Sequence, residues 1–149
     1  MTTTEQAFAV IRARLEANTA IPLRWPFQDA PPVEDTPANF VFIDFQVDRP
    51  AGGPAGYGGG RGNNLWRRTA ELILWLHVPR GQGFEYSAAT ADPLRVLFHS
   101  YRDNDISCFD SVVIPIGPGS GISPPGADSA VDNYDVTAVV TEMHFDQIG

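Results

Sequence analysis

The sequence LWRRTAELILWLHV, at residues 65–78, predicts one long β-strand. Side chains on a strand alternate between its two faces. One face therefore carries Trp66, Arg68, Ala70, Leu72, Leu74 and Leu76. The apolar run within it, Leu72–Leu76, is far shorter than the roughly 20 residues that cross a bilayer, so it indicates a strand.

A second strand is predicted just before this one, at Asn39–Asp48. Val41, Ile43, Phe45 and Val47 recur there at every second position, which is typical of a half-buried strand. The intervening residues 50–63 contain seven glycines. A segment of this length is too long for a tight turn, so we expect a long β-hairpin with a flexible, protruding tip.

The N-terminal residues predict a helix from about residue 4 to 18. Thr2 and Glu5 have the spacing of a capping box, in which two side chains satisfy free backbone groups at a helix start. Phe8, Ile11 and Leu15 then follow at the spacing of one helical face.

A second helix is expected after the Pro- and Gly-rich break at residues 79–83. Pro93 fits its first turn if Thr90 is the N-cap, whereas Pro93 would kink a helix that begins at Ser87. Both alternatives share the same apolar face, made of Leu94, Leu97, Phe98 and Tyr101.

Two further strands are predicted, at Ser107–Ile116 and Val131–Phe145, separated by a Gly-, Pro- and Ser-rich loop at 117–130. Pro115 indicates that the first lies at a sheet edge. Along this first strand we expect one continuous alternation of side chains between the two faces, with Cys108, Val112, Ile114 and Ile116 in the apolar positions. An outward row, covered either by a helix or by a neighbouring subunit, is expected to comprise Phe42, Thr137, Val139, Thr141 and Met143.

The order of these elements is typical of an α+β fold: an antiparallel sheet of about four to five strands with two helices packed on one face. At 149 residues the chain has the length of one domain, which we expect to span residues 1–149.

The charge is distributed unevenly. All ten basic residues are Arg and none lies beyond Arg102, while eight acids and no base follow from Asp103 onward. A net charge of -8 without Lys disfavours a protein that grips nucleic acid. The excess of acidic residues either keeps the protein soluble or forms a surface that faces an anion and prevents it from binding.

No motif for chemistry is found. His77, His99 and His144 are far apart and lack metal-ligand spacing, and Cys108 is the only cysteine. The glycines at 56–62 lack the Lys of a phosphate-binding loop and run into a strand. We therefore expect a protein that is not an enzyme, with no catalytic residue, cofactor or metal and no membrane partner.

The two Gly-rich loops, 50–63 and 117–130, are conspicuous instead, because loops that become ordered on contact with a partner are common in assembly proteins. Candidate assembly-interface residues are Gly58, Gly59, Gly60, Arg61, Trp66, Arg68, Gly119, Gly121, Ile122 and Pro124.

This order of features resembles the tail terminator (tail completion) family of long-tailed bacteriophages, typified by the lambda tail terminator. The resemblance covers nearly the whole chain, although each motif is degenerate, and both Pro93 and the 117–130 loop depart from the usual pattern. The matching features are the Phe8, Ile11 and Leu15 helix, the Pro22 and Trp25 segment, the aromatic strand Phe40–Phe45, the Gly/Arg-rich hairpin tip, the segment Leu76–Gly83, the Ala-rich helix Ala88–Phe98, and the last strand at Tyr134–Val140.

The resemblance implies a virion protein of the tail and neck, assembled in the bacterial cytoplasm as a ring of six copies. Its partners would be itself, the tail tube protein and a neck, connector or stopper protein. DNA would pass through an acidic lumen without sequence-specific binding. The alternatives are another ring component of the neck or tail, such as a head–tail connector, stopper or tail-tube protein, and a small ligand-binding domain or enzyme.

Overall fold

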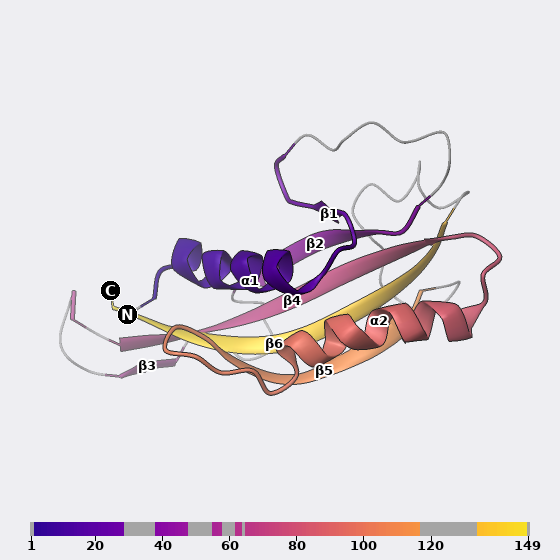
Figure 1. Cartoon of the computed structure of the whole chain (residues 1–149). Helices are drawn as coiled ribbons and strands as arrows, with labels where there is room; N and C mark the ends of the chain where they lie inside the picture. The colour runs from indigo at the N-terminus through magenta and orange to yellow at the C-terminus, as the bar shows by residue number, and fades with distance from the viewer. Residues whose placement is uncertain are drawn as a thin grey trace.

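A computed structural model describes residues 2–28, 38–47, 55–57, 62–63, 65–116 and 134–148, and shows one sheet with two helices on a single face (Figure 1). The helices are α1 (Thr4–Asn18) and α2 (Phe84–Phe98). The strands are β1 (Leu23–Arg24), β2 (Phe40–Val47), β3 (Ala55–Tyr57), β4 (Leu65–Pro79), β5 (Ser107–Pro115) and β6 (Tyr134–Ile148). The expected α+β class is confirmed.

The sheet has the strand order β1-β2-β4-β6-β5 and is mostly antiparallel. β1 is the exception, because it runs parallel to β2. The predicted hairpin is confirmed as β2 and β4, paired from Phe40 opposite His77 to Val47 opposite Ala70. Its connection is not all loop, since β3 pairs with the first residues of β4. The expected flexible tip otherwise lies outside the described residues.

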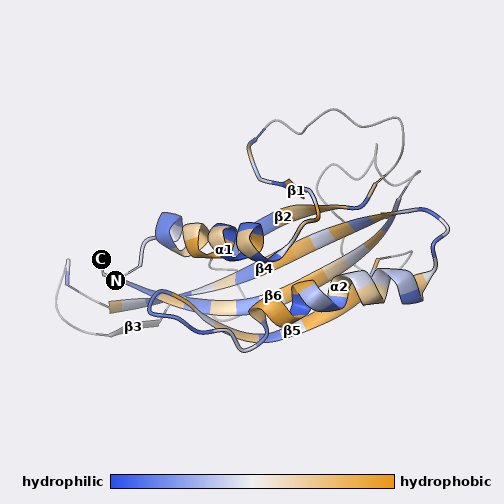
Figure 2. Cartoon of the chain, viewed as in Figure 1, coloured by the Kyte–Doolittle hydropathy of each residue, from blue (hydrophilic) through white to orange (hydrophobic). Residues whose placement is uncertain are grey.

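The main core lies between β4 and the helices. Leu72, Leu74 and Leu76 of β4 are fully buried on the helical face, as their alternation predicts. α1 packs Ala7, Ile11 and Leu15 into this cluster, and α2 packs Ala91, Leu94 and Phe98. Figure 2 shows that the most hydrophobic stretches of the strands coincide with the region the helices cover.

The predicted bounds of α1 are confirmed, but its cap is one residue later than expected. The N–H of Gln6 donates to Thr3 Oγ1 (3.1 Å), and the N–H of Thr3 donates to Gln6 Oε1 (2.9 Å). Thr2 is instead held in the sheet layer, because its N–H donates to the Asp146 carbonyl (2.9 Å). The capping box of Thr2 and Glu5 was therefore a wrong prediction.

Both predicted starts of α2 are wrong. The helix begins at Phe84, because Gly83 with φ of +88° turns the chain into it, a conformation that suits glycine. Pro93 lies in the helix interior. Tyr101 lies beyond the helix end, and its ring faces Arg14 of α1, whose guanidinium carbon is 3.7 Å from the ring centre.

A β-bulge interrupts the alternation predicted for β5. Cys108 pairs with Met143 and Ser111 with Thr141, so two residues of β5 oppose one of β6. Cys108 consequently joins the core beneath the helices, whereas Ile114 and Ile116 belong to the opposite face. The position of β5 at a sheet edge is confirmed.

For the outward row expected on β6, the first alternative, cover by a helix, is confirmed, and one member of the row is wrong. Val139 and Met143 are buried in the main core with residues of α2, so this chain's own helix covers them. Phe42 does not belong to that row, because it packs on the opposite face.

That opposite face carries a second apolar cluster, which the sequence analysis did not predict. Ile73, Trp75, Val136 and Ala138 are buried there. The centres of β4 and β6 are therefore buried on both faces. Within the described part of the chain, Trp75 Nε1 is the one buried side-chain nitrogen or oxygen without a hydrogen-bond partner.

The buried hydroxyl pair between β5 and β6 offers a test of the bulged register. Ser111 Oγ and Thr141 Oγ1 are 2.7 Å apart and buried. We expect Thr141→Val to lower the free energy of unfolding by about 1–3 kcal/mol, because it leaves the Ser111 hydroxyl buried without this partner. Adding Ser111→Ala should recover most of that loss in urea denaturation. Additive losses in the double variant would contradict the pairing.

Candidate assembly surfaces

The structure places two of the predicted interface residues, Trp66 and Arg68, on the same face near the start of β4. Both are half-buried, and Arg68 Nε donates to Gln147 Oε1 of β6 (3.1 Å). The other eight lie outside the described residues: Gly58, Gly59, Gly60, Arg61, Gly119, Gly121, Ile122 and Pro124.

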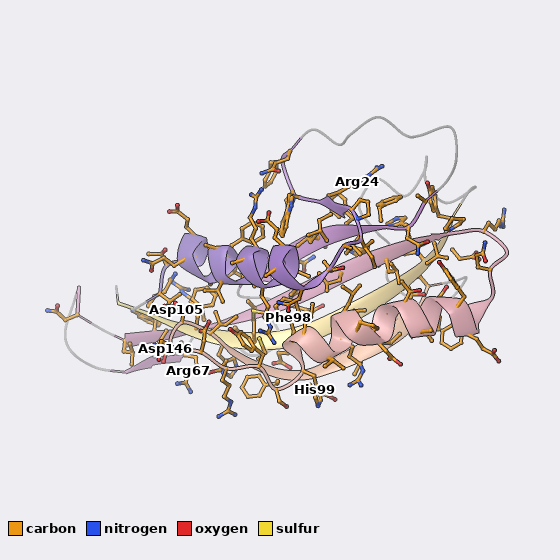
Figure 3. All side chains as sticks on the ribbon, in the orientation of Figure 1. Arg24, Arg67, Phe98, His99, Asp105 and Asp146 are labelled. Atoms are coloured by element: carbon orange, nitrogen blue, oxygen red, sulfur yellow. The ribbon has the colours of Figure 1, made fainter. Side chains whose placement is uncertain are left out.

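A groove of about 540 Å³ lies at this end of the sheet, between the 102–107 turn and the paired ends of β4 and β6. Arg67 forms an ion pair with Asp146 across the two strands, with nitrogen–oxygen distances of 3.0 and 3.3 Å (Figure 3). The hydrogen bond from Arg67 lowers the pKa of Asp146. The Thr2 hydroxyl donates to Asp105 (3.0 Å).

The turn beside this groove is built around another carboxylate. Asp103 Oδ1 accepts the N–H groups of Asp105 (2.7 Å) and Ile106 (2.8 Å). The carboxylates of the groove therefore bind the chain's own donors. Among the described residues, no group of three or more His, Cys, Asp or Glu side chains is placed to hold a metal ion.

The histidines and the cysteine lie on different elements, with no shared centre. His77 Nδ1 donates to the Trp75 carbonyl (2.9 Å), and its ring stacks on Phe40. Burial lowers the pKa of His77. Cys108 is buried, and burial, assisted by Asp103, raises its thiol pKa to about 12. That thiol is therefore protonated at neutral pH, which suits an inert core residue.

Most of the exposed large hydrophobic side chains lie on α2 and on the edge strand β5, and we name the exposed side chains of these two elements the α2–β5 flank. Of the six large hydrophobic side chains exposed among the described residues, only Phe27 lies elsewhere. α2 packs over β5 and β6 (Figure 1), but Val112 pairs with Val140 and therefore lies on the sheet face opposite α2. The Tyr86 hydroxyl accepts a hydrogen bond from Asn39 Nδ2 (3.0 Å), so Tyr86 faces the start of β2. The flank comprises Phe84, Tyr86, Val96, Phe109 and Val112, with exposed fractions of 57, 43, 62, 36 and 42%.

α2 has apolar residues on two faces. Its inner face carries Ser87, Ala91, Leu94 and Phe98. On the outer side, Tyr86, Ala89, Pro93 and Val96 follow at intervals of three, four and three residues and are all exposed. This spacing places them on one stripe of the helix. The sequence analysis missed this stripe because it followed only the inner face and began the helix too late.

No protein-family model matches the chain, and no curated protein matches it. Several solved structures match, and one of them has a similar fold with 12% sequence identity and a TM-score of 0.53, over 100% of this chain and 99% of that one. At this identity the likeness concerns the fold alone. In the part of the chain that is described, neither helix has the length and apolar character needed to cross a membrane.

The buried His77 predicts a dependence of stability on pH. Its pKa in the folded protein lies below the ordinary value of 6.5, so below about pH 6.5 the unfolded chain binds a proton that the folded chain resists. We expect the free energy of unfolding to fall as the pH drops through this range, and to fall less steeply in His77→Phe. Denaturant titrations at pH 8 and pH 5.5 measure the difference.

The matched control is His144→Gln, which removes a half-buried histidine and should keep the pH dependence. Equal pH dependence in the wild type and in His77→Phe would contradict this role of His77.

Proposed function

We propose that the chain is a structural subunit of a phage tail that assembles into a ring of six copies. The observation that carries this proposal is the α2–β5 flank, with five exposed large hydrophobic side chains on two elements that pack against each other. Exposed apolar patches of this kind mark protein–protein contacts. Side chains of Phe, Tyr and Val there would lose water on contact with another copy, which favours association.

The difference between the two edges of the sheet favours a ring. The opposite edge of the sheet is formed by the short β1 and by β2, so the two sides of the subunit differ. A contact between unlike surfaces is head-to-tail, and it closes into a ring when the rotation between copies permits. Such a ring leaves the ends of the sheet available for the tail tube on one side and the neck or stopper protein on the other.

The proposed acidic lumen is supported by charges on the face opposite the helices. Glu71 of β4 lies directly across from Glu142 of β6, and Asp44 of β2 lies on the next row of the same face. A lumen lined in this way would repel phosphate and let DNA pass without binding.

The resemblance noted in the sequence adds to this support, because the fold has the expected order of a helix, a hairpin, a second helix and a final strand pair. The groove beside Arg67 gives less support to a ligand-binding protein, because Arg67 pairs with Asp146 and the carboxylates of Asp103 and Asp105 accept bonds from this chain. We therefore place the function in assembly, in the virion tail and neck.

The flank is tested by placing a charge in it. Val96→Glu and Val112→Glu change side chains that are exposed in the subunit, so we expect little change in its own stability. Burying an unpaired carboxylate between copies should weaken the ring about tenfold or more. Native mass spectrometry and sedimentation across a concentration series measure the shift from rings to monomers.

Gln6→Glu is the matched control. It adds the same charge at an exposed position of α1, and Glu suits the capping box there. Rings that persist in both flank variants would show that the flank is not the contact. A wild-type chain that stays monomeric at high concentration would refute the ring, and open-ended polymers would favour a tail-tube protein.

A further inference from the structure

His99 lies directly after α2 and faces the outer edge of β5 (Figure 3). Its Nδ1 is 3.2 Å from the backbone nitrogen of Ser111 and 3.1 Å from Asp110 Oδ1. Two different partners therefore lie within hydrogen-bond distance of one ring nitrogen.

One nitrogen cannot serve both partners at once. The Ser111 N–H is a donor, so it binds Nδ1 only when that nitrogen carries no proton and accepts. Asp110 is an acceptor, so it binds Nδ1 only when that nitrogen carries a proton and donates. The uncharged ring with its proton on Nε2 fits Ser111, whereas the imidazolium fits Asp110.

The Ser111 N–H points away from the rest of the sheet. β5 is an edge strand whose inner neighbour is β6, and the N–H of Ile116 donates inward to the Val136 carbonyl (3.0 Å). Successive N–H groups of a strand alternate in direction, so those of Ser111 and Val113 point outward. Pro115, at the next outward position, has no N–H.

The start of this edge is already covered by the segment that follows α2. The N–H of Cys108 donates to the Tyr101 carbonyl (2.7 Å), and the N–H of Ser100 donates to the Phe109 carbonyl (2.9 Å). Together with Pro115, these bonds leave Ser111 and Val113 as the outward donors of the strand. Exposed strand edges promote unwanted pairing between chains, and proteins commonly block them.

We propose that His99 is a protonation-dependent cap on the edge of β5. The uncharged imidazole accepts the Ser111 N–H and closes the edge. Protonation turns Nδ1 into a donor, which binds Asp110 and releases the Ser111 N–H to solvent beside that of Val113. This device acts within one subunit and does not depend on the ring.

Other charged and titratable groups lie near His99. Arg95 of α2, whose carbonyl accepts the His99 N–H, is paired with Asp92. Arg102 and Asp103 lie in the turn that follows. From β6, His144 contacts the ring of Phe109, next to Asp110. Asp110 is the acid within hydrogen-bond distance of Nδ1, and histidines ordinarily change charge between pH 5 and 8.

Amide and imidazole NMR of the isotope-labelled full chain, followed from pH 8 to pH 5, tests the cap. At pH 8 we expect the ring proton of His99 on Nε2 and a protected Ser111 amide. The protection factor of the Ser111 amide, corrected for intrinsic exchange, should fall as the His99 ring gains its second proton. We expect a fall of about threefold to tenfold, which corresponds to the loss of one hydrogen bond.

Three variants separate the parts of this device. His99→Gln should remove the pH response of Ser111, Asp110→Asn should remove the acceptor that binds the protonated ring, and His144→Gln should leave the response unchanged. A Ser111 amide that does not respond while His99 titrates would overturn the proposal. So would a proton on Nδ1 at pH 8, or a response that persists in His99→Gln or disappears in His144→Gln.

Discussion

Burial of β4 on both faces is the constraint on which the rest of the structure depends. Leu72, Leu74 and Leu76 pack beneath the helices, while Ile73 and Trp75 are buried on the opposite face. A strand with this composition is stable only between two neighbours and with both faces covered. β2 and β6 supply the neighbours, and the connections through α2 and β5 follow from that arrangement. The sheet edge at β5, with α2 above it, is then left to form the outer side of the molecule.

Periodicity in the sequence predicted the large elements well. The two-residue alternation located β2, β4 and β6, and the three- and four-residue spacing located α1 and the inner face of α2, because each of these patterns reflects burial on one side. The errors arose where a single backbone feature decides the outcome. The cap moved to Thr3, Gly83 set the start of α2, and the bulge after Cys108 reversed the faces of β5. Such features depend on contacts with residues far away in the sequence, and the periodicity of a segment carries no information about those contacts.

The candidate site was harder to predict than the fold. Glycine-rich loops suggested assembly contacts, and of the ten named residues the structure describes Trp66 and Arg68. The α2–β5 flank became visible only once α2 was known to begin at Phe84 and the bulge was known to bring Val112 to an exposed position. A second apolar stripe on one helix is detectable in sequence when both faces are examined. The packing of α2 over β5 and β6 is a property of the fold.

A chain that combines a two-sided sheet, one apolar flank and a closed sheet edge is well suited to ordered association rather than open-ended strand pairing. The most direct measurement of this account is the structure of the purified assembly by electron cryomicroscopy. We expect a closed ring with a central pore, with Val96 and Val112 buried at every boundary between subunits. A particle without a pore, or a ring in which these side chains face solvent, would contradict the account.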